Sequence, residues 1–379
     1  MQILLLDGGL GTTLESPPYN VTFTPQTPLW SSHLLLSSPS TLAAVHRSFR
    51  AAGADILLTA TYQSSTEGFT RTNPNLRIQD AERYMRSAVG IARGVFDDTS
   101  SAFASVSQGP MEGTQGQKQG FSRPCRVALS LGPYGATMVP VSAEYTGVYP
   151  CEMDRENALR SWHARRLGVF ADDRDAWDGV EYVAFETVKR TDEVRAMRGA
   201  MLDVTQIQGQ EQGYEKKPWW VCGVFPAEEV DESEVRQWVD AAFGGVEDDS
   251  GSALPRPWGI GVNCTRIDHV GKIVDIMRDQ LHRIIKQSDG LVDEWTSRSG
   301  RPWLVLYPDG TKGEKYDPVT KTWVAGATAV RQPWEESFWD VVQRQAESDW
   351  EGIIIGGCCR AGPADIAALR RRVDSRSST

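Results

Sequence analysis

The stretch Gly352-Ile-Ile-Ile-Gly-Gly-Cys-Cys-Arg360 is typical of a buried strand that ends where two adjacent cysteines begin. A second apolar run, Trp258-Gly-Ile-Gly-Val-Asn-Cys264, also has a cysteine at its carboxyl end. Two predicted strand ends therefore carry three thiols. Three thiolates from separate strand ends suit a catalytic zinc site, because three protein ligands leave the fourth tetrahedral position open for substrate.

Other interpretations of these cysteines stay open at this point. A free cysteine often behaves as a small buried hydrophobe, so core packing would account for any single one of them. It accounts less well for Cys358 and Cys359 together, because neighbours on a strand point to opposite faces and Gly356-Gly357 indicates a turn. A Cys358–Cys359 disulfide is a further alternative, although such bonds are rare in a reducing compartment.

Length and composition limit the classes of protein to consider. The chain has 379 residues, 40% hydrophobic and 24% charged, which is enough for one large α/β domain or two ordinary ones. Its net charge of −10 argues against binding to nucleic acid or to an anionic membrane. No segment resembles a membrane span, and the first apolar run lacks the basic region of a signal peptide. Six irregularly spaced cysteines do not suggest a secreted disulfide framework, so we expect a cytoplasmic protein.

Predicted strands and helices alternate along the whole chain. The predicted strands are 3–6, 56–60, 126–131, 180–185, 219–224, 258–263, 302–307 and 352–355. The predicted helices that follow them are 40–52, 80–95, 154–171, 191–202, 231–243, 270–285, 334–348 and 363–372. This count predicts an α/β fold, a single (βα)8 barrel with inserted loops that spans residues 1–379. A doubly wound open sheet is the alternative.

Three segments are longer than a compact barrel requires. Residues 97–123 are rich in Ser, Gly and Gln, which predicts a mobile surface insertion. Residues 243–257 form an acidic loop with Gly, Ser and Pro, and residues 308–333 a long polar loop. From the sequence alone, none of the three has an assigned role.

The barrel prediction brings distant residues to one mouth, since reacting groups in such barrels come from the carboxyl ends of the strands. Asp7 follows the first predicted strand and Glu186 the fourth, so both should lie near the three cysteines. A helix cap or a solvated rim would explain an acidic residue equally well. Beside zinc thiolates, however, Asp7 and Glu186 favour recognition of a cationic group such as the ammonium of an amino acid.

Motifs along nearly the whole chain carry a resemblance to a known family. They are Asp7-Gly-Gly-Leu-Gly-Thr-Thr-Leu-Glu15, Gly53-Ala-Asp-Ile-Leu-Leu-Thr-Ala-Thr-Tyr-Gln63, Ser130-Leu-Gly-Pro-Tyr-Gly-Ala136, Glu144-Tyr-Thr-Gly147, Phe185-Glu-Thr187, Gly261-Val-Asn-Cys264, Tyr307-Pro308 and Gly356-Gly-Cys-Cys-Arg360. With these motifs the chain resembles the zinc-dependent homocysteine S-methyltransferases, which include S-methylmethionine:homocysteine and betaine:homocysteine methyltransferases. The two cysteine motifs in this order are the specific part of the resemblance.

The resemblance implies the barrel, the metal and the substrate. It implies Zn²⁺ held by Cys264, Cys358 and Cys359, and homocysteine held near Asp7 and Glu186. It also implies that backbone amides after Asp7 and the segment 61–63 meet the substrate carboxylate. The substrate-binding residues so implied are Asp7, Gly8, Gly9, Thr61, Gln63 and Glu186.

The expected reaction is methyl transfer to homocysteine, giving methionine. A free thiol has a pKa of about 8.5, and zinc coordination deprotonates it, so the sulfur becomes a nucleophile without a general base. Its target should be a methyl on a positively charged sulfur or nitrogen. Betaine-using relatives extend well past the double cysteine, whereas 20 residues follow Cys359, which favours S-methylmethionine, with S-adenosylmethionine as a second donor. We expect a monomer or weak oligomer.

Two alternatives to this function remain. One is a betaine-type homocysteine methyltransferase, and the other is a zinc- or redox-responsive homologue without activity, which should form a reversible Cys358–Cys359 bond. The histidines match no ligand spacing and are interpreted as structural or surface residues: His33, His46, His163, His269 and His282. The remaining cysteines are interpreted as packing residues: Cys125, Cys151 and Cys222.

Overall fold

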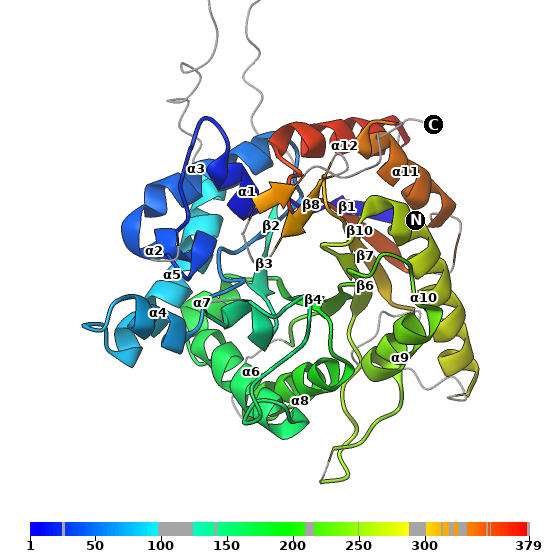
Figure 1. Cartoon of the computed structure of the whole chain (residues 1–379), viewed down its shortest axis with the longest axis horizontal. Helices are drawn as coiled ribbons and strands as arrows, with labels where there is room; N and C mark the ends of the chain where they lie inside the picture. Colours follow the sequence, from blue (N-terminus) through cyan, green and yellow to red (C-terminus); the bar gives the residue numbers. More distant parts are fainter. Residues whose placement is uncertain are drawn as a thin grey trace, which may run out of the picture.

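Eight parallel strands form a closed barrel in the computed structural model (Figure 1). The structure describes residues 1–24, 27–97, 124–139, 142–208, 216–248, 250–287, 301–311, 314–317, 322–324, 332–345, 348 and 350–376. The sheet order is β1-β10-β7-β6-β5-β4-β3-β2. The barrel strands are β1 (Gln2–Leu5), β2 (Ile56–Leu58), β3 (Arg126–Leu131), β4 (Tyr182–Val188), β5 (Trp219–Gly223), β6 (Gly259–Asn263), β7 (Trp303–Tyr307) and β10 (Gly352–Ile355).

The first and second strands close the barrel. Leu6 forms a parallel bridge with Ile56, and the Asp7 N–H donates to the Ile56 carbonyl at 3.1 Å. On the other side of this bridge, the Asp55 N–H donates to the Leu5 carbonyl at 2.6 Å. These bonds leave no open sheet edge between β1 and β2, so the (βα)8 prediction is confirmed and the open doubly wound sheet is not the fold.

Helices surround the strands, as Figure 1 shows. Those that follow the eight strands in turn, each matching a predicted helix, are α3 (Pro39–Ala51), α5 (Ile78–Asp97), α6 (Glu156–Ala171), α8 (Thr191–Gln208), α9 (Glu232–Phe243), α10 (Ile267–Gln287), α11 (Trp334–Gln345) and α12 (Pro363–Arg376). Shorter helical segments that the sequence did not reveal are α1 (Leu10–Glu15), η1 (Trp30–His33), α2 (Leu34–Ser37), α4 (Thr66–Thr72), η2 (Tyr134–Thr137) and α7 (Arg174–Asp178).

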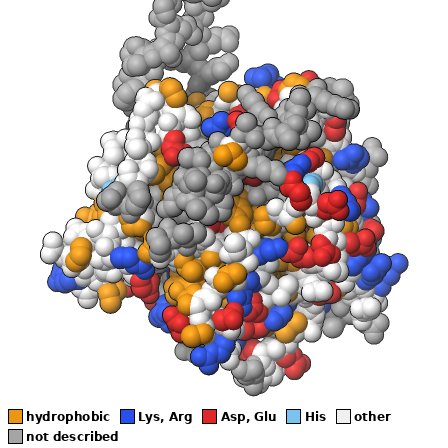
Figure 2. Space-filling view, in the orientation of Figure 1, with side chains coloured by type: hydrophobic (Ala, Val, Ile, Leu, Met, Phe, Trp, Pro, Cys, Tyr) orange, Lys and Arg blue, Asp and Glu red, His pale blue; other side chains and the backbone are white. Residues whose placement is uncertain are grey.

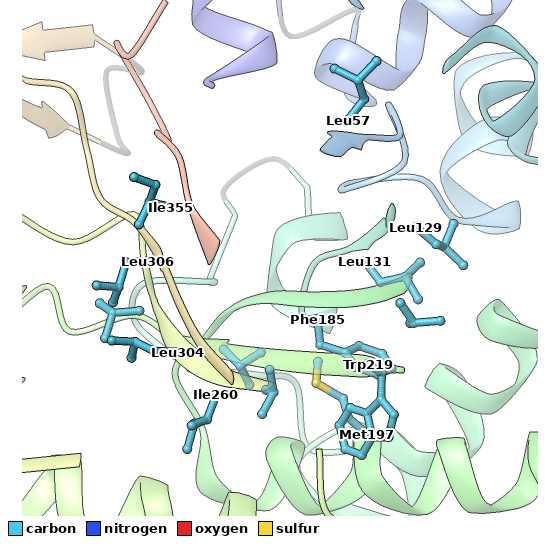
Figure 3. Packing of buried hydrophobic residues seen from close by; sticks show 14 of the residues in the cluster. Leu57, Leu129, Leu131, Phe185, Met197, Trp219, Ile260, Leu304, Leu306 and Ile355 are labelled. Atoms are coloured by element: carbon cyan, nitrogen blue, oxygen red, sulfur yellow. The ribbon is translucent and has the colours of Figure 1, made fainter. Parts of the chain in front are cut away.

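Strand alternation divides the core into two layers. On β5, Trp219 and Val221 belong to the large cluster between strands and helices, whereas Trp220 and Cys222 belong to a second cluster that fills the barrel. Figure 3 shows part of the outer layer, where Met197 of α8 lies near Trp219 and Phe185. The barrel interior is thus packed with side chains of the described strands, as in other barrels of this type, in which substrates bind at the mouth.

Two glycines on β6 allow this strand to pack closely against its neighbours β5 and β7. A Cβ on Gly261 would lie 1.7 Å from the carbonyl oxygen of Val305, and a Cβ on Gly259 would lie 3.1 Å from the Cβ of Trp220. The rings of Trp258 and Trp303 stack at 4.8 Å nearby. The Gly-Ile-Gly pattern of this strand therefore reflects close strand packing.

The three predicted inserted segments differ in position and structure. Apart from Asp97, which ends α5, the segment 97–123 lies outside the described residues. Segment 243–257 connects the end of α9 to the start of β6, at the amino end of the barrel and away from the mouth, where the buried Arg198 donates to the carbonyls of Gly244 and Leu254. Segment 308–333 contains the antiparallel pair β8 (Lys315–Asp317) and β9 (Thr322–Val324).

In Figure 2, charged side chains gather on the right and lower parts of the visible face, and hydrophobic ones gather toward its middle. No helix within the described ranges is long and apolar enough to cross a bilayer.

Candidate active site

The ends of β6 and β10 bring the three predicted cysteines together. Cys264 directly follows β6 with a φ of +45°, and its N–H donates to the Tyr307 carbonyl at 3.3 Å. The Cys358 N–H donates to the Pro308 carbonyl at 2.8 Å. These bonds hold both cysteine segments against the end of β7, so residues 94 positions apart in the sequence have Cα atoms only 5.5 Å apart.

Cys264 and Cys358 are joined by a disulfide in the structure, and Cys359 is a free thiol. The alternative pairing of the two adjacent cysteines, Cys358 with Cys359, is therefore wrong for this structure. Reduction of the Cys264–Cys358 disulfide would leave three free thiols close together at the barrel mouth.

Asp309 joins the three cysteines in one potential ligand group. The sulfurs of Cys264, Cys358 and Cys359 and a carboxylate oxygen of Asp309 all lie within 4.8 Å of one another. Zn–S bonds of about 2.3 Å place the sulfurs of a tetrahedral site about 3.8 Å apart, so reduction would have to separate the Cys264 and Cys358 sulfurs to this distance for the group to hold zinc. Burial raises the pKa of the Cys359 thiol and raises that of Asp309 to about 7, and a bound cation would favour both ionised forms.

Asn263 orients the first of these cysteines. Its Nδ2 donates to the Oγ1 of Thr187 at 2.8 Å and lies 3.4 Å from the Sγ of Cys264. Its Oδ1 accepts from the Thr187 N–H at 2.7 Å, where Thr187 has a φ of +59°. The amide therefore joins the end of β4 to the thiol after β6, as outer-shell groups do in metal sites.

Asp7 and Glu186 lie at the same mouth, as the sequence predicted. Asp7 is 1% exposed and its Oδ2 accepts from the Leu58 N–H at 2.9 Å. Burial, with a smaller contribution from the negative charge of Glu186, raises the pKa of Asp7 well above its ordinary value. Burial also raises the pKa of Glu186 to about 7. The Asp7 Oδ1 and Glu186 Oε1 atoms are buried and have no hydrogen-bond partner among the described residues, so a cationic ligand would satisfy both carboxylates.

The two glycines after Asp7 allow the chain to pass close to the double-cysteine loop. A Cβ on Gly8 would lie 2.3 Å from the Ala361 carbonyl oxygen, and a Cβ on Gly9 2.4 Å from that of Cys358. The Gly9 N–H donates to the Ala361 carbonyl at 2.9 Å. The Gly9 amide is thus bonded to the backbone in this structure, and its assignment to the substrate carboxylate stays a prediction; the close approach itself requires a residue without a side chain.

Arg166 of α6 forms hydrogen bonds that fix the segment after β2. The Arg166 guanidinium donates to the carbonyls of Gly132 at 2.7 Å, Thr61 at 2.8 Å and Tyr62 at 2.7 Å. The Thr61 hydroxyl donates to the Ser130 carbonyl at 2.6 Å and is fully buried, so its side chain fixes the loop. Gln63 is half-buried beside it.

A model of one protein family matches residues 4–373, and its description is homocysteine S-methyltransferase. The chain belongs to this family of methyltransferases. Curated relatives include the selenocysteine Se-methyltransferase of Brassica oleracea var. italica, 31% identical over 99% of this chain and 90% of the relative. Homocysteine S-methyltransferase 2 of Arabidopsis thaliana is 30% identical over 99% of this chain and 94% of its own length.

A solved structure has the same fold. The metallated form of the homocysteine methyltransferase MmuM from Escherichia coli matches with a TM-score of 0.59 and 23% identity, over 98% of this chain and 96% of that one. At that identity the match supports the barrel architecture of the methyltransferase.

Two residues at the mouth, Glu144 and Tyr145, were not among the predicted site residues, and Tyr62 was included only as part of the segment 61–63. Burial raises the pKa of Tyr62 and of Tyr145 well above the usual value, and Glu144 raises both further. Cys359 in its ionised form also raises the pKa of both tyrosines, which indicates that both lie near this thiol. The Glu144-Tyr-Thr-Gly147 motif was the available signal, and nothing in its residue types marked it as part of the site.

The histidines stay outside the cysteine group in the described part of the methyltransferase. His46 and His163 are buried, and His163 Nε2 lies 2.9 Å from the carboxylate of Glu193. Cys222 is packed inside the barrel and Cys125 against the outer core, as predicted. Cys151 is exposed, so its interpretation as a packing residue is wrong.

Proposed function

We propose that the protein transfers a methyl group from a sulfonium donor to homocysteine, giving methionine, with the homocysteine sulfur held on Zn²⁺ by Cys264, Cys358 and Cys359. The observation that carries this proposal is the convergence of three cysteine sulfurs from two strand ends at one barrel mouth. Bound Zn²⁺ would keep the homocysteine sulfur deprotonated and nucleophilic at neutral pH. A reducing cytoplasm would keep the thiols available to the metal.

The residues around the metal group position the amino acid part of homocysteine. Asp7 and Glu186 hold its ammonium, because both are buried carboxylates with an oxygen that has no donor in the described part of the chain. The Gly8 amide and the loop 61–63, which Arg166 holds in place, receive its carboxylate. With both ends fixed, the sulfur is aimed at the donor, and such orientation supplies on the order of 7 kcal/mol or more.

The charge at the mouth favours a cationic methyl donor. Asp7, Glu144, Glu186 and Asp309 are acidic, and the rings of Tyr62 and Tyr145 lie among them, as the electrostatic effects on their pKa values indicate. Acidic groups and aromatic faces both attract a sulfonium. On transfer, the bond between the donor sulfur and its methyl breaks, the homocysteine sulfur forms a bond to that methyl, and the donor leaves as a neutral thioether with the electron pair.

S-methylmethionine is the proposed donor and S-adenosylmethionine the second, while betaine is the alternative. Reduced, zinc-loaded protein should be given homocysteine with each donor in turn, and methionine should be measured. We expect turnover with S-methylmethionine, a lower rate with S-adenosylmethionine and little with betaine. Preferential use of betaine would replace the sulfonium proposal.

Selenocysteine is a second candidate acceptor, because a relative 31% identical to this chain is named a selenocysteine Se-methyltransferase. A selenol is more acidic and softer than a thiol and would suit the same metal group. Competition between homocysteine and selenocysteine for a limiting amount of enzyme, read out as the ratio of methylated products, decides between the two acceptors.

A further inference from the structure

A small pocket lies at the barrel mouth beside the double-cysteine loop. Its walls come from α1, from the loop after β7 and from the segment that leads into α12, and Figure 1 shows α1 and α12 on the same side of the barrel. The pocket has a volume of about 290 Å³, which suits a ligand the size of an amino acid, since pockets for drug-sized molecules begin at about 300 Å³. The residues that line it include Thr12, Thr13, Gly310, Glu314, Arg360 and Gly362.

The pocket adjoins the group of potential metal ligands. Its lining residues Gly310 and Arg360 directly follow Asp309 and Cys359, which both belong to that group. The Gly310 N–H donates to the Cys359 carbonyl at 2.8 Å, and the Arg360 N–H donates to the Oγ1 of Thr12 at 2.9 Å. These bonds join the three walls of the pocket to the double-cysteine loop, so a ligand in the pocket would lie next to the thiols.

The pocket carries one charge of each sign. The Nη2 of Arg360 lies 2.9 Å from the Oε1 of Glu314, and the two side chains are 42% and 26% exposed. An ion pair this open to solvent contributes little to stability, so both groups can exchange partners at low cost. A guanidinium binds a carboxylate through two parallel hydrogen bonds, and a carboxylate accepts hydrogen bonds from an ammonium. The amino acid end of S-methylmethionine carries both groups, whereas betaine carries a carboxylate but no primary ammonium.

We propose that this pocket binds the amino acid end of the methyl donor, with Arg360 on the donor carboxylate and Glu314 on the donor ammonium. The inference rests on the proposed sulfonium transfer and names the site of the donor, whereas Asp7 and Glu186 are proposed to hold the acceptor. The ion pair between Arg360 and Glu314 opens as the donor enters, and each side chain takes a new partner of opposite charge. With this end held, the sulfonium at the other end of the donor extends toward the adjacent thiols.

Binding of the donor without homocysteine tests the pocket, because no methyl transfer occurs when the acceptor is absent. Calorimetric titrations would use S-methylmethionine and two analogues that each lack one charge. These are 4-(dimethylsulfonio)butanoate, which has no ammonium, and (3-aminopropyl)dimethylsulfonium, which has no carboxylate. The proteins would be reduced, zinc-loaded, full-length wild type, Arg360→Met and Glu314→Gln. Arg372→Met is the matched control, because Arg372 forms a surface ion pair of the same kind, 3.3 Å from Glu336.

Each substitution should weaken the binding of one analogue and spare the other. We expect Arg360→Met to bind S-methylmethionine and the butanoate about tenfold or more weakly, and the aminopropyl compound no more weakly than wild type. Glu314→Gln should bind S-methylmethionine and the aminopropyl compound more weakly, and the butanoate no more weakly. Arg372→Met should match wild type. Unchanged affinities in both pocket variants, or wild type that binds none of the three compounds, would overturn the proposal.

Steady-state kinetics separates the donor from the acceptor. In both pocket variants, KM for S-methylmethionine should rise about tenfold or more, while KM for homocysteine should change by less than about twofold. A rise confined to KM for homocysteine would assign the pocket to the acceptor and contradict the inference. Wild type that binds S-methylmethionine with the expected dependence on Arg360 and Glu314, but forms no methionine with homocysteine, would support the pocket and refute the proposed function.

Discussion

At the scale of single residues, burial raises the pKa of Asp7 and of Glu186, the two carboxylates proposed to hold the ammonium of the substrate. Both are nearly inaccessible to solvent, and the negative charge of Glu186 raises the pKa of Asp7. Such a pair is costly without a cation and favourable with one. The ammonium of homocysteine, whose proton is retained at neutral pH, would offset this cost on binding.

Replacing Glu186 by Gln should weaken homocysteine binding. We expect KM for homocysteine to rise about tenfold or more at pH 8 with a smaller change in kcat, because the lost charge acts on the bound ammonium rather than on the reacting sulfur. Wild-type KM should rise as the pH falls below about 7, since burial raises the pKa of Glu186 to about 7, and a protonated carboxyl attracts an ammonium weakly. Steady-state kinetics across this pH range, with exposed Glu67→Gln as control, checks both effects. An unchanged KM in Glu186→Gln would reject the ammonium role.

The free energy of unfolding should also depend on pH through Glu186. The pKa of Glu186 rises from its ordinary value of 4.5 to about 7 on folding, so the folded state holds this proton more tightly than the unfolded state. The free energy of unfolding of substrate-free protein should therefore fall as the pH rises from about 4.5 to about 7, by about 3 kcal/mol from this group. Urea unfolding at both ends of this range should show a smaller fall for Glu186→Gln than for wild type. Equal falls in the free energy of unfolding for the two proteins would contradict the raised pKa of Glu186.

At the scale of elements, α6 supports the loops that the proposed function assigns to substrate binding. The Arg166 guanidinium is buried, which lowers its pKa to about 10, and it donates to carbonyls after both β2 and β3. The Arg166 guanidinium thus donates the hydrogen bonds that water would otherwise supply to these buried carbonyls. One side chain therefore joins the two loops.

Replacing Arg166 by Met should remove this support. Three carbonyls would lose a charged donor, so we expect a loss of about 3 to 5 kcal/mol in the free energy of unfolding and a higher KM for homocysteine. Arg165→Met, at the exposed neighbouring position on α6, should change stability by less than about 0.5 kcal/mol. Urea unfolding of the two variants provides the comparison. Similar stabilities for both would exclude a supporting role for Arg166.

Replacing Gly261 by Ala tests the close contact between β6 and β7. The new Cβ would lie 1.7 Å from the Val305 carbonyl oxygen, so the strands must separate beside Cys264, and we expect a loss of more than about 3 kcal/mol together with weaker metal binding. Gly245→Ala is the control, because nothing lies within 4 Å of its Cβ position. Thermal unfolding and metal titration measure the two effects. A normally stable Gly261→Ala protein would contradict the packing described for this strand.

At the scale of the whole molecule, the sequence predicted the features that depend on the repeated strand–helix pattern. Apolar runs closed by turn residues marked each of the eight strands, and the barrel topology then placed Cys264 beside the double cysteine. The strand ends shifted by a few residues, as at β4, which continues to Val188 through a register irregularity. Periodicity carries no information about such irregularities.

The sequence could not predict contacts that arise only from the folded arrangement. Asp309 follows a strand like many polar loop residues, and only the positions of the β6 and β10 loops bring it to the sulfurs. Arg166 is one of several arginines on its helix, and its partners are backbone carbonyls, which leave no trace in the sequence. The bond from the Gly9 N–H to Ala361 joins residues at opposite ends of the chain for the same reason.

The most direct test of the central claim measures zinc content and methionine formation on the same preparations of reduced wild type, Cys264→Ser and exposed Cys151→Ser. Wild type and Cys151→Ser should bind about one zinc per chain and form methionine from homocysteine and S-methylmethionine, and Cys264→Ser should lose both. Full turnover in a metal-free preparation, or a Cys264→Ser protein that keeps its zinc and its activity, would contradict the account.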